Sequence, residues 1–332
     1  MTANDELNVV YQCDEAYAEF LRGSVASLLD NNRLIPKLNV HVLDAGLSEP
    51  STQALRELVA GYGREVRFYE TAKYDHFCRQ NNVPQWRGKY ITWYKLLSVT
   101  DLQGITSDRI LYINPQCLVT GHLDGLLEFD FSGRLFGLSY ECILTERHKR
   151  RLGLDPSDGY FNCGVMLVNL SKWKQDDITE KNMRSLSEFS DYMIVDQDFI
   201  NVKYHDEIKY LGTAKYDIDT RYYTNRVDNI YRVYKFHENQ NYHDRTELLA
   251  SIGAPAIIYH KPLVSFPPYD KVFALWQRYF RIAGITYTPR ISPVWRLLWW
   301  VRSWAPDGLA LRFESSYIDI SVQRHGRLHR AG

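Results

Sequence analysis

The sequence predicts an α/β fold with a mostly parallel central sheet and helices on both faces. Short apolar runs alternate with segments of helical periodicity through the first ~120 residues. A second observation is the apolar run 109–119, which is interrupted by Asn114-Pro115-Gln116. Such a run is typical of a buried parallel strand that brings polar groups to its carboxyl end. Ligands bind at that end in open α/β sheets, so residues 114–116 are site candidates.

The first half of the chain follows the alternation closely. Residues 8–11 form an apolar run that enters a turn with carboxylates, and residues 17–29 then repeat apolar side chains at helical spacing. After the next strand and its turn, Ser48 or Ser51 is placed to cap a helix that ends near Tyr62. The expected strands are 8–11, 38–43, 65–69 and 110–113, and the last helix of this half is 90–102, after a loop around residues 81–84.

The second half is less regular. Strands are expected at 135–140, 209–211 and 256–259, and residues 160–169 are expected to form a polar loop that feeds a buried strand. Residues 146–152 are expected to form a charged helical turn, and a helix with acidic residues in its first turn begins at Val195. No clear linker precedes residues 286–293. We therefore expect one domain over residues 1–285 and a separate tail over residues 286–332.

Composition excludes several classes of protein. Lysine plus arginine and aspartate plus glutamate both number 40, so there is no basic excess for a nucleic-acid partner. The five cysteines are scattered without metal-ligand spacing, which predicts neither a disulfide framework nor a zinc site. We expect a cytoplasmic protein, since the sequence contains no signal-peptide pattern and no run of ~18 apolar residues.

Several polar residues have both a functional and a structural interpretation. Asp14 and Tyr17 would hold a base by hydrogen bonding and stacking, or would cap and pack a helix. Asp196 and Asp198 would orient sugar hydroxyls, or would be helix-start carboxylates. When each of these residues is considered alone, its structural interpretation is favoured.

Taken together and in order, these segments resemble the retaining glycosyltransferases of family 8, especially the bacterial members that build lipooligosaccharide. The resemblance covers residues 8–270 and implies a GT-A fold, with a Rossmann-like sheet that binds a UDP-sugar. A joint match of this kind is hard to obtain by chance. The resembling segments are Asn8–Tyr17, His41–Glu49, Thr92–Leu96, Arg109–Val119, Asp158–Gly164, Asn169–Trp173 and Asp196–Asp198.

The resemblance implies a role for each donor-binding residue. Asp14 would bond the uracil and Tyr17 would stack on it. Lys95 stands where the family usually has an arginine that reaches the donor. Glu141 and Asn162 stand at positions that contact the donor sugar.

Catalytic roles are implied for Asp196 and Gln197. Together with Asn162 they stand where the family grips the donor sugar and supplies the polar group beside its anomeric carbon. In the family the counterpart of Gln197 is debated as a nucleophile or as the stabiliser of a front-face ion pair. An amide is a poor nucleophile, so the stabilising role is physically easier.

The chain departs from the family at the metal site. The family has Asp-x-Asp where this chain has Asn114-Pro115-Gln116, and those carboxylates hold Mn²⁺ or Mg²⁺. The family's histidine ligand maps to Tyr259, and the neighbouring His260 would point to the other face of a strand. The family's phosphate-binding lysine maps to Ser265, for which Lys261 is a candidate substitute. The sequence therefore predicts a site without a tightly bound divalent cation.

Three functions are compatible with this departure. The first is a retaining hexosyltransferase that moves galactose or glucose from a UDP-sugar to a glycan or glycolipid. In that case Lys95, Lys261 or His260 would stabilise the diphosphate without metal. The second is a protein that binds a nucleotide sugar without turnover, and the third is a scaffold partner of an active glycosyltransferase. Because the sets around Asp14 and Gln197 are retained, donor binding is favoured.

The tail contains a segment rich in tryptophan. Residues 293–304 hold four tryptophans and two arginines, which suits a helix in the headgroup layer of a membrane. We expect peripheral association with the inner face of the cytoplasmic membrane, as the family resemblance also implies. The alternative is a helix that packs on the domain or on a second subunit.

Overall fold

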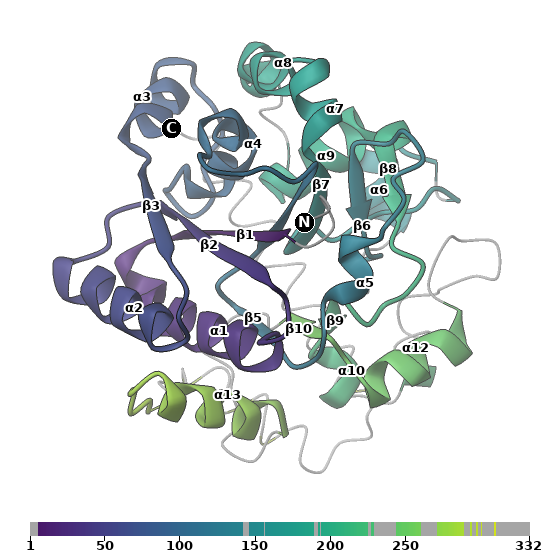
Figure 1. Ribbon diagram of the computed structural model, residues 1–332. Helices are drawn as coiled ribbons and strands as arrows, with labels where there is room; N and C mark the ends of the chain where they lie inside the picture. Colours follow the sequence, from purple (N-terminus) through teal and green to yellow (C-terminus); the bar gives the residue numbers. More distant parts are fainter. Residues whose placement is uncertain are drawn as a thin grey trace.

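The computed structural model describes residues 6–141, 146–155, 157–188, 194–224, 227–228, 244–259 and 271–288, together with residues 192, 293, 297, 300 and 309. Figure 1 shows an α/β arrangement in which a twisted sheet lies between two layers of helices. The α/β architecture predicted from the alternating runs is confirmed.

The main sheet has seven strands in the order β3-β2-β1-β4-β7-β6-β8. β1 pairs in parallel with β2 and β4, β2 pairs in parallel with β3, and β6 pairs in parallel with β8. β7 runs antiparallel to both β4 and β6, so its direction is reversed relative to its neighbours. The strands are β1 Glu6–Cys13, β2 Lys37–Asp44, β3 Val66–Glu70, β4 Arg109–Ile113, β6 Phe136–Leu138, β7 Val165–Asn169 and β8 Ile208–Tyr210.

A second, three-stranded sheet has the order β5-β10-β9. Its strands are β5 Cys117–Val119, β9 Ile218–Asp219 and β10 Ile257–Tyr259. β10 pairs antiparallel with β5 and parallel with β9. The turn at residues 114–116 therefore carries the chain from one sheet to the other.

Helices cover both faces of the main sheet. In Figure 1, α1, α2 and α13 lie below it, and α3, α4, α7 and α8 lie above it. No helix among the described residues is long and apolar enough to cross a bilayer. The helices are η2 Glu15–Tyr17, α1 Ala18–Asn31, α2 Glu49–Gly61, α3 Ala72–Gln80, η3 Ile91–Trp93, α4 Tyr94–Leu97, η4 Val99–Asp101, α5 Asp124–Leu127, α6 Glu146–Arg151, α7 Leu170–Gln175, α8 Ile178–Ser185, η5 Leu186–Glu188, α9 Val195–Lys203, η6 His205–Glu207, α10 Arg221–Thr224, α12 Arg245–Gly253 and α13 Lys271–Ile282.

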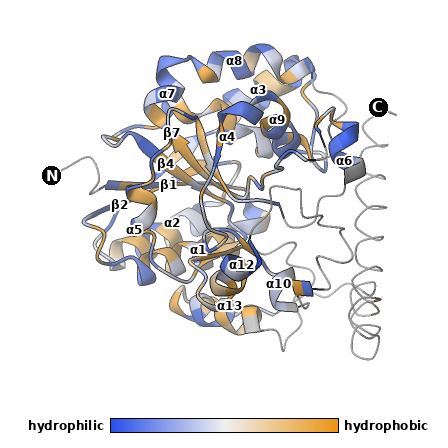
Figure 2. Ribbon diagram, turned by 90° about the vertical axis from the view of Figure 1, so that its right-hand side faces the viewer, coloured by the Kyte–Doolittle hydropathy of each residue, from blue (hydrophilic) through white to orange (hydrophobic). Residues whose placement is uncertain are grey.

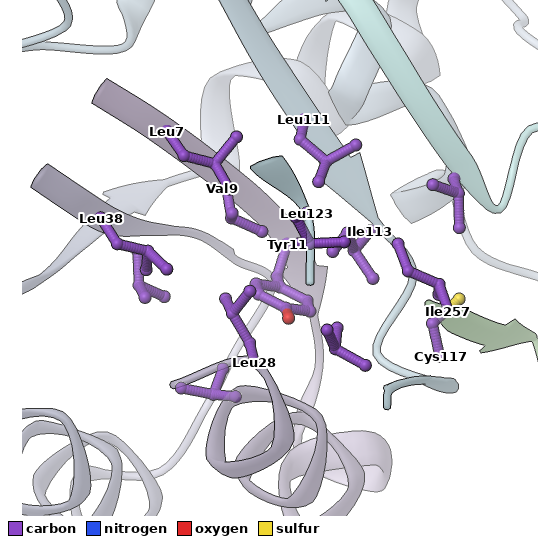
Figure 3. Close-up of a cluster of buried hydrophobic side chains, with 14 of the residues drawn as sticks. Leu7, Val9, Tyr11, Leu28, Leu38, Leu111, Ile113, Cys117, Leu123 and Ile257 are labelled. Carbon is purple, nitrogen blue, oxygen red and sulfur yellow. The ribbon is translucent and has the colours of Figure 1, made fainter. Parts of the chain in front are cut away.

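Each face of the sheet has its own hydrophobic core. Leu7, Val9 and Tyr11 of β1 point to the same side and pack with Leu28 of α1 (Figure 3). Val10, which lies between them in sequence, belongs to the core on the other face. Figure 2 shows the largely hydrophobic strands β1, β4 and β7 between helices in which hydrophilic and hydrophobic residues are mixed. Alternation of side chains along buried strands explains why both faces are apolar.

Helix α13 was not expected from the sequence and packs closely against α1. A Cβ atom at Gly23 of α1 would lie 2.9 Å from the Phe280 ring and 3.1 Å from the Trp276 ring. The absent side chain at Gly23 therefore lets the two helices approach each other. Arg22 also donates a hydrogen bond to the carbonyl of Ala283, just beyond α13.

The helix predicted over residues 90–102 is wrong. The segment consists of three short pieces, η3, α4 and η4, and Leu102 has an extended backbone. Trp93, Leu96 and Leu97 are all buried, so their apolar spacing reflects burial on several sides and not one face of a helix. The β-branched and aromatic residues at 91–94 also have low helix propensity.

The structure adds helices that were not expected and decides between the two candidate caps of α2. The unexpected α3 precedes the loop around residues 81–84, and its buried Tyr74 and Cys78 lie one turn apart. The second half of the chain adds α7, α8 and α12. Ser48 is the N-cap of α2, and its side chain accepts a hydrogen bond from the Ser51 N–H.

A buried polar network lies on β1 and β2, away from the carboxyl ends of the strands. His41 is fully buried, its Nδ1 lies 2.9 Å from the Tyr69 hydroxyl, and its Nε2 lies 3.2 Å from Asn8 Oδ1. Burial lowers the pKa of His41 to about 4, with a further contribution from the charge of Arg67. Because Asn8 Oδ1 can only accept, Nε2 carries the proton of the neutral imidazole.

The strand order reverses at β1, which lies between β2 and β4. The carboxyl ends of β1 and β4 lie at one edge of the sheet, and this is the place where open α/β sheets bind ligands. The carboxyl end of β6 reaches the same edge, as does the amino end of the reversed β7, since Ile113 pairs with Val165. We call this edge the ligand edge.

Candidate functional site

The ligand edge receives polar residues from several segments. Asp14 follows β1, Asn114 follows β4, and Glu141 lies beyond the end of β6. Asn162 precedes β7, and Gln197 lies in the first turn of α9. These residues are far apart in the sequence and reach one edge because the strand ends meet there.

Lys95 of α4 is a buried cation at this edge, with only 6% of the residue exposed. Its Nζ lies 2.6 Å from Asp196 Oδ2 and donates a 2.8 Å hydrogen bond to the carbonyl of Cys163. The ammonium also lies 4.6 Å from the centre of the Tyr112 ring. These contacts compensate the cost of burying the charge and hold the ammonium in one place.

Glu141, Asn162 and Gln197 form a buried cluster. Glu141 Oε2 accepts hydrogen bonds from Asn162 Nδ2 at 2.7 Å and from Gln197 Nε2 at 3.2 Å. Gln197 Oε1 accepts from the Cys163 N–H at 3.2 Å, and Asn162 Oδ1 accepts from the Gly164 N–H at 2.7 Å. Both amides thus have a fixed orientation, since backbone N–H groups can pair only with their oxygens.

Asp198 lies behind this cluster and is fully buried. Its Oδ1 accepts from His148 Nε2 at 2.8 Å and from the Tyr160 hydroxyl at 2.5 Å, and its Oδ2 accepts from the Ile194 N–H at 2.9 Å. Burial acts to raise the pKa of Asp198, but these hydrogen bonds and the His148 charge outweigh it and place the pKa below its ordinary value. Asp198 is therefore an ionised carboxylate.

Asp14 and Tyr17 lie at the first turn after β1. Asp14 Oδ2 forms an ion pair with Lys89, while its buried Oδ1 has no hydrogen-bond partner among the described residues. Tyr17 ends η2 and is half-buried against the cores around α1. The neighbouring Glu15 has a structural role, since it accepts hydrogen bonds from Ser48 at the start of α2.

Asn114 and Gln116 form a neutral turn at the end of β4. Asn114 Oδ1 accepts a 3.2 Å hydrogen bond from the Gln116 N–H, and the Asn114 carbonyl accepts a 2.8 Å bond from the Cys117 N–H. The Asn114 N–H donates to the Gly164 carbonyl at 2.8 Å, which ties the turn to β7. Both side chains are partly buried.

Comparison with known proteins assigns the family. The model of glycosyl transferase family 8 matches residues 8–249. This chain belongs to glycosyl transferase family 8. The family expected from the sequence resemblance is thereby confirmed.

The curated relatives of this family 8 chain include proteins of lipopolysaccharide synthesis. The chain is 26% identical over 214 residues to a lipopolysaccharide 1,2-glucosyltransferase of Escherichia coli, an alignment that covers 62% of this chain and 61% of that protein. It is 25% identical over 213 residues to a putative glycosyltransferase of Haemophilus influenzae, with 62% of each chain covered. The chain thus spans about three fifths of the length of these relatives.

Solved structures support the same family fold. The galactosyltransferase LgtC, in complex with donor and acceptor sugar analogues, is similar with a TM-score of 0.66 and 25% identity, over 87% of this chain and 99% of that one. The bifunctional glycosyltransferase WbbM, at 16% identity, has a TM-score of 0.65 over 83% of this chain and 49% of that one. The GT-A fold implied by the resemblance is confirmed.

The metal site of the family does not fit the residues of this chain. Asn114 and Gln116 offer neutral amides, and Asn114 Oδ1 already accepts a backbone hydrogen bond. Burial raises the pKa of Tyr259 well above its ordinary value, so this residue presents a neutral phenol where the family has a histidine. In the described part of the chain, no group of three or more His, Cys, Asp or Glu side chains is arranged to hold a metal ion. His260 and Lys261 lie outside the described residues.

Four residues near the ligand edge were not anticipated from the sequence as site residues. Tyr160 and His148 contact the buried Asp198, and Asp217 and Asp219 lie buried beside β10. Asp217 adds to the electrostatic environment that raises the pKa of Tyr259. The alternation Asp217-Ile218-Asp219 around one apolar residue was a usable signal, because it places two carboxylates on the same face of a strand.

Proposed function

We propose that this chain transfers a hexosyl group, galactose or glucose, from a UDP-sugar to a glycan or glycolipid acceptor with retention of configuration. The observation that carries the proposal is the buried cluster of Glu141, Asn162 and Gln197 beside the Lys95 ammonium. Buried polar groups with fixed orientations cost free energy and are expected where a ligand must be oriented. The lipopolysaccharide transferases among the relatives support an acceptor of this class.

Asp14 and Tyr17 bind the base in this proposal. The buried Asp14 Oδ1 has no hydrogen-bond partner among the described residues, so it is available to the N3–H of uracil. Tyr17 lies at the same turn and offers a ring for stacking. The sheet edge at which both lie is the edge used by nucleotides in folds of this class.

Lys95 stabilises the diphosphate as it departs. Its ammonium carries three N–H groups, and Asp196 and the Cys163 carbonyl take two of them. The remaining positive charge, held in a water-poor setting, favours the negative charge that develops on the leaving oxygen. A family 8 chain whose Asn114 and Gln116 are neutral is thereby expected to act without a tightly bound divalent cation.

Gln197 stabilises the sugar in the transition state. The bond between the anomeric carbon and the phosphate oxygen breaks, and the acceptor oxygen attacks on the same face while its proton passes to the departing phosphate. Gln197 Oε1, held by the Cys163 N–H, places a partial negative charge near the positive sugar. Glu141, Asn162 and Asp196 orient the sugar hydroxyls.

A second candidate function is binding of a nucleotide sugar without turnover, as a partner of an active glycosyltransferase. The neutral turn at Asn114 and Gln116 favours it, because the site lacks both carboxylates of the family motif. Calorimetric titration with UDP, UDP-galactose and UDP-glucose, each with Mn²⁺ and with EDTA, tests both candidates when combined with a transfer assay.

Each result of the titration has one meaning. Micromolar binding that EDTA does not change, together with transfer in EDTA, supports the metal-independent enzyme. Binding without transfer to any acceptor or to water supports the second candidate. Binding that requires Mn²⁺ contradicts the metal-independent site, and absence of binding in both buffers contradicts donor binding altogether.

We also propose that residues 293–304 bind the cytoplasmic face of a membrane, as a tail distinct from the domain over residues 1–285. Leu297 and Trp300 are helical positions one turn apart, and each is 59% exposed. Exposed Trp and Leu on one side of a helix suit the headgroup layer. Flotation with anionic and with neutral vesicles tests the proposal, and Trp300→Ala should reduce binding to the anionic vesicles. Equal flotation of both proteins would contradict it.

A further inference from the structure

A chain of buried hydrogen bonds leads from α6 to Gln197. His148 Nε2 and the Tyr160 hydroxyl both donate to Asp198 Oδ1, at 2.8 and 2.5 Å. The Tyr160 oxygen lies 3.4 Å from Gln197 Nε2, which donates to it. Tyr160 and Asp198 are fully buried, and the His148 ring packs edge-on against the Tyr160 ring at 6.0 Å between centroids.

The direction of each hydrogen bond in this chain follows from the charge of Asp198. An ionised carboxylate only accepts, so the Tyr160 hydroxyl must donate to it. The Tyr160 oxygen is then left as an acceptor, which selects the NH₂ group of Gln197 and not its carbonyl. The amide is thereby turned with Oε1 toward the Cys163 N–H.

If the hydroxyl were free to turn, the opposite orientation would be opposed by the Cys163 N–H and by Glu141 but no longer by Tyr160. Without a charged acceptor behind it, the Tyr160 hydroxyl would be able to donate to Gln197 Oε1, which would favour an amide rotated by 180° about its last torsion. His148 helps to prevent this, because its hydrogen bond is one of those that keep Asp198 ionised. A buried charge in this position is costly for stability, whereas apolar residues of similar volume would pack without that cost.

We propose that Tyr160 and His148 are positioning residues, which act through Asp198 to hold the Gln197 amide in one orientation. The inference rests on the proposed function, in which Gln197 Oε1 faces the anomeric carbon of the donor sugar. Through His148, α6 would help to assemble the site, although no residue of α6 is proposed to contact the donor sugar.

Four variants test the inference. Tyr160→Phe removes the hydroxyl that joins Asp198 to Gln197, and Tyr204→Phe is its matched control. Tyr204 is also buried and donates a 2.5 Å hydrogen bond, but to Asn182, away from the ligand edge. His148→Met removes the donor to Asp198, whereas His148→Gln keeps an N–H group at the place of Nε2.

Two quantities separate positioning from general damage. One is kcat, measured with the KM for the UDP-sugar. The other is the ratio of the Kd for UDP to the Kd for the UDP-sugar, which reports contacts to the sugar without any turnover. Melting temperatures identify variants whose fold is damaged.

We expect Tyr160→Phe and His148→Met to lower kcat about 10- to 100-fold, the range for a lost hydrogen bond to a buried charge, and to bring the Kd ratio toward one. The Kd for UDP should stay within about twofold, since the base and diphosphate contacts are untouched. His148→Gln should keep most of the activity, and Tyr204→Phe should leave kcat and the Kd ratio unchanged.

The inference is overturned if Tyr160→Phe keeps the wild-type kcat and Kd ratio. It is also overturned if His148→Gln and His148→Met are equally impaired, because then the donor to Asp198 is not what matters. A wild-type chain that transfers nothing but prefers a UDP-sugar over UDP contradicts the proposed transferase, and the Kd ratios of the variants still decide the inference. If the wild-type Kd for UDP equals its Kd for the UDP-sugar, so that their ratio is one, both the proposed transferase and the inference are contradicted.

Discussion

Acidification is expected to destabilise this protein through His41 before most carboxylates are protonated. His41 is fully buried, and its pKa is lowered from 6.5 to about 4. Between these two pH values the unfolded chain binds a proton that the folded chain does not bind. The free energy of unfolding therefore has its full value above pH 6.5 and falls as the pH decreases toward 4.

The size of the effect follows from the two pKa values. Each pH unit between them corresponds to ~1.4 kcal/mol, so the full loss is about 3 kcal/mol for a pKa that falls from 6.5 to about 4. This is a large part of the roughly 5–15 kcal/mol that is usual for the stability of a folded domain. The physical cause is that protonated His41 would place a charge inside the sheet layer, beside the polar but neutral Asn8 and Tyr69.

Urea unfolding at pH 7.5, 6.0 and 4.5 measures this dependence. The His41→Gln variant keeps polar atoms in the network but does not titrate, so its stability should change less over this range than that of the wild type. The exposed His122 provides the matched control, and His122→Gln should behave as the wild type does. Parallel curves for the wild type and His41→Gln would refute the reasoning, because the pH dependence would then arise elsewhere.

Three further predictions concern the ligand edge and the packing of α13. Lys95→Met should weaken UDP binding and lower kcat at least tenfold in calorimetry and transfer assays, since it removes a buried cation and leaves Asp196 without that partner. The control Lys172→Met, which also removes a partly buried lysine paired with an aspartate, Asp176, should have little effect. Asn114→Asp combined with Gln116→Asp should make activity depend on Mn²⁺, and a double variant that titrates no Mn²⁺ would show that these positions do not face the diphosphate. Gly23→Val should lower the free energy of unfolding by about 1–3 kcal/mol through overpacking against Phe280. Gly61→Ala, where a Cβ atom meets nothing within 4 Å, should not be destabilising in the same urea titration.

The sequence predicted the strands and the first two α-helices of the first half well because these elements are locally encoded. A serine cap separates β2 from α2, and of the two candidates, Ser48 and Ser51, the structure has Ser48 at the N-cap. The segment 90–102 was misjudged because burial from several sides produces apolar spacing that mimics a helix. α13 was missed although its apolar positions have helical spacing, and its partner surface on α1 depends on Gly23.

The candidate site was predictable in part. Asp14, Glu141, Asn162 and Gln197 were named from the resemblance, and the structure brings the last three into one hydrogen-bonded cluster. The ion pair between Asp14 and Lys89 was not predictable, because the two residues meet only through the fold. The same holds for the hydrogen bond from His148 to Asp198, in which neither residue has a local sequence signature for its partner.

The reversed direction of β7 has a consequence for how this scaffold can diversify. The chain leaves β6 and enters β7 at the ligand edge, because these two strands are antiparallel neighbours. The described residues of this connection are 139–141, 146–155 and 157–164. Insertions or exchanges within this segment leave the hydrogen-bonded register of the sheet untouched. The connection nevertheless carries Glu141, His148 and Asn162, so a change in it would alter the proposed sugar pocket while the proposed base-binding turn after β1 stayed as it is. A family built on this plan can vary what it transfers, and to what, independently of the nucleotide that delivers it.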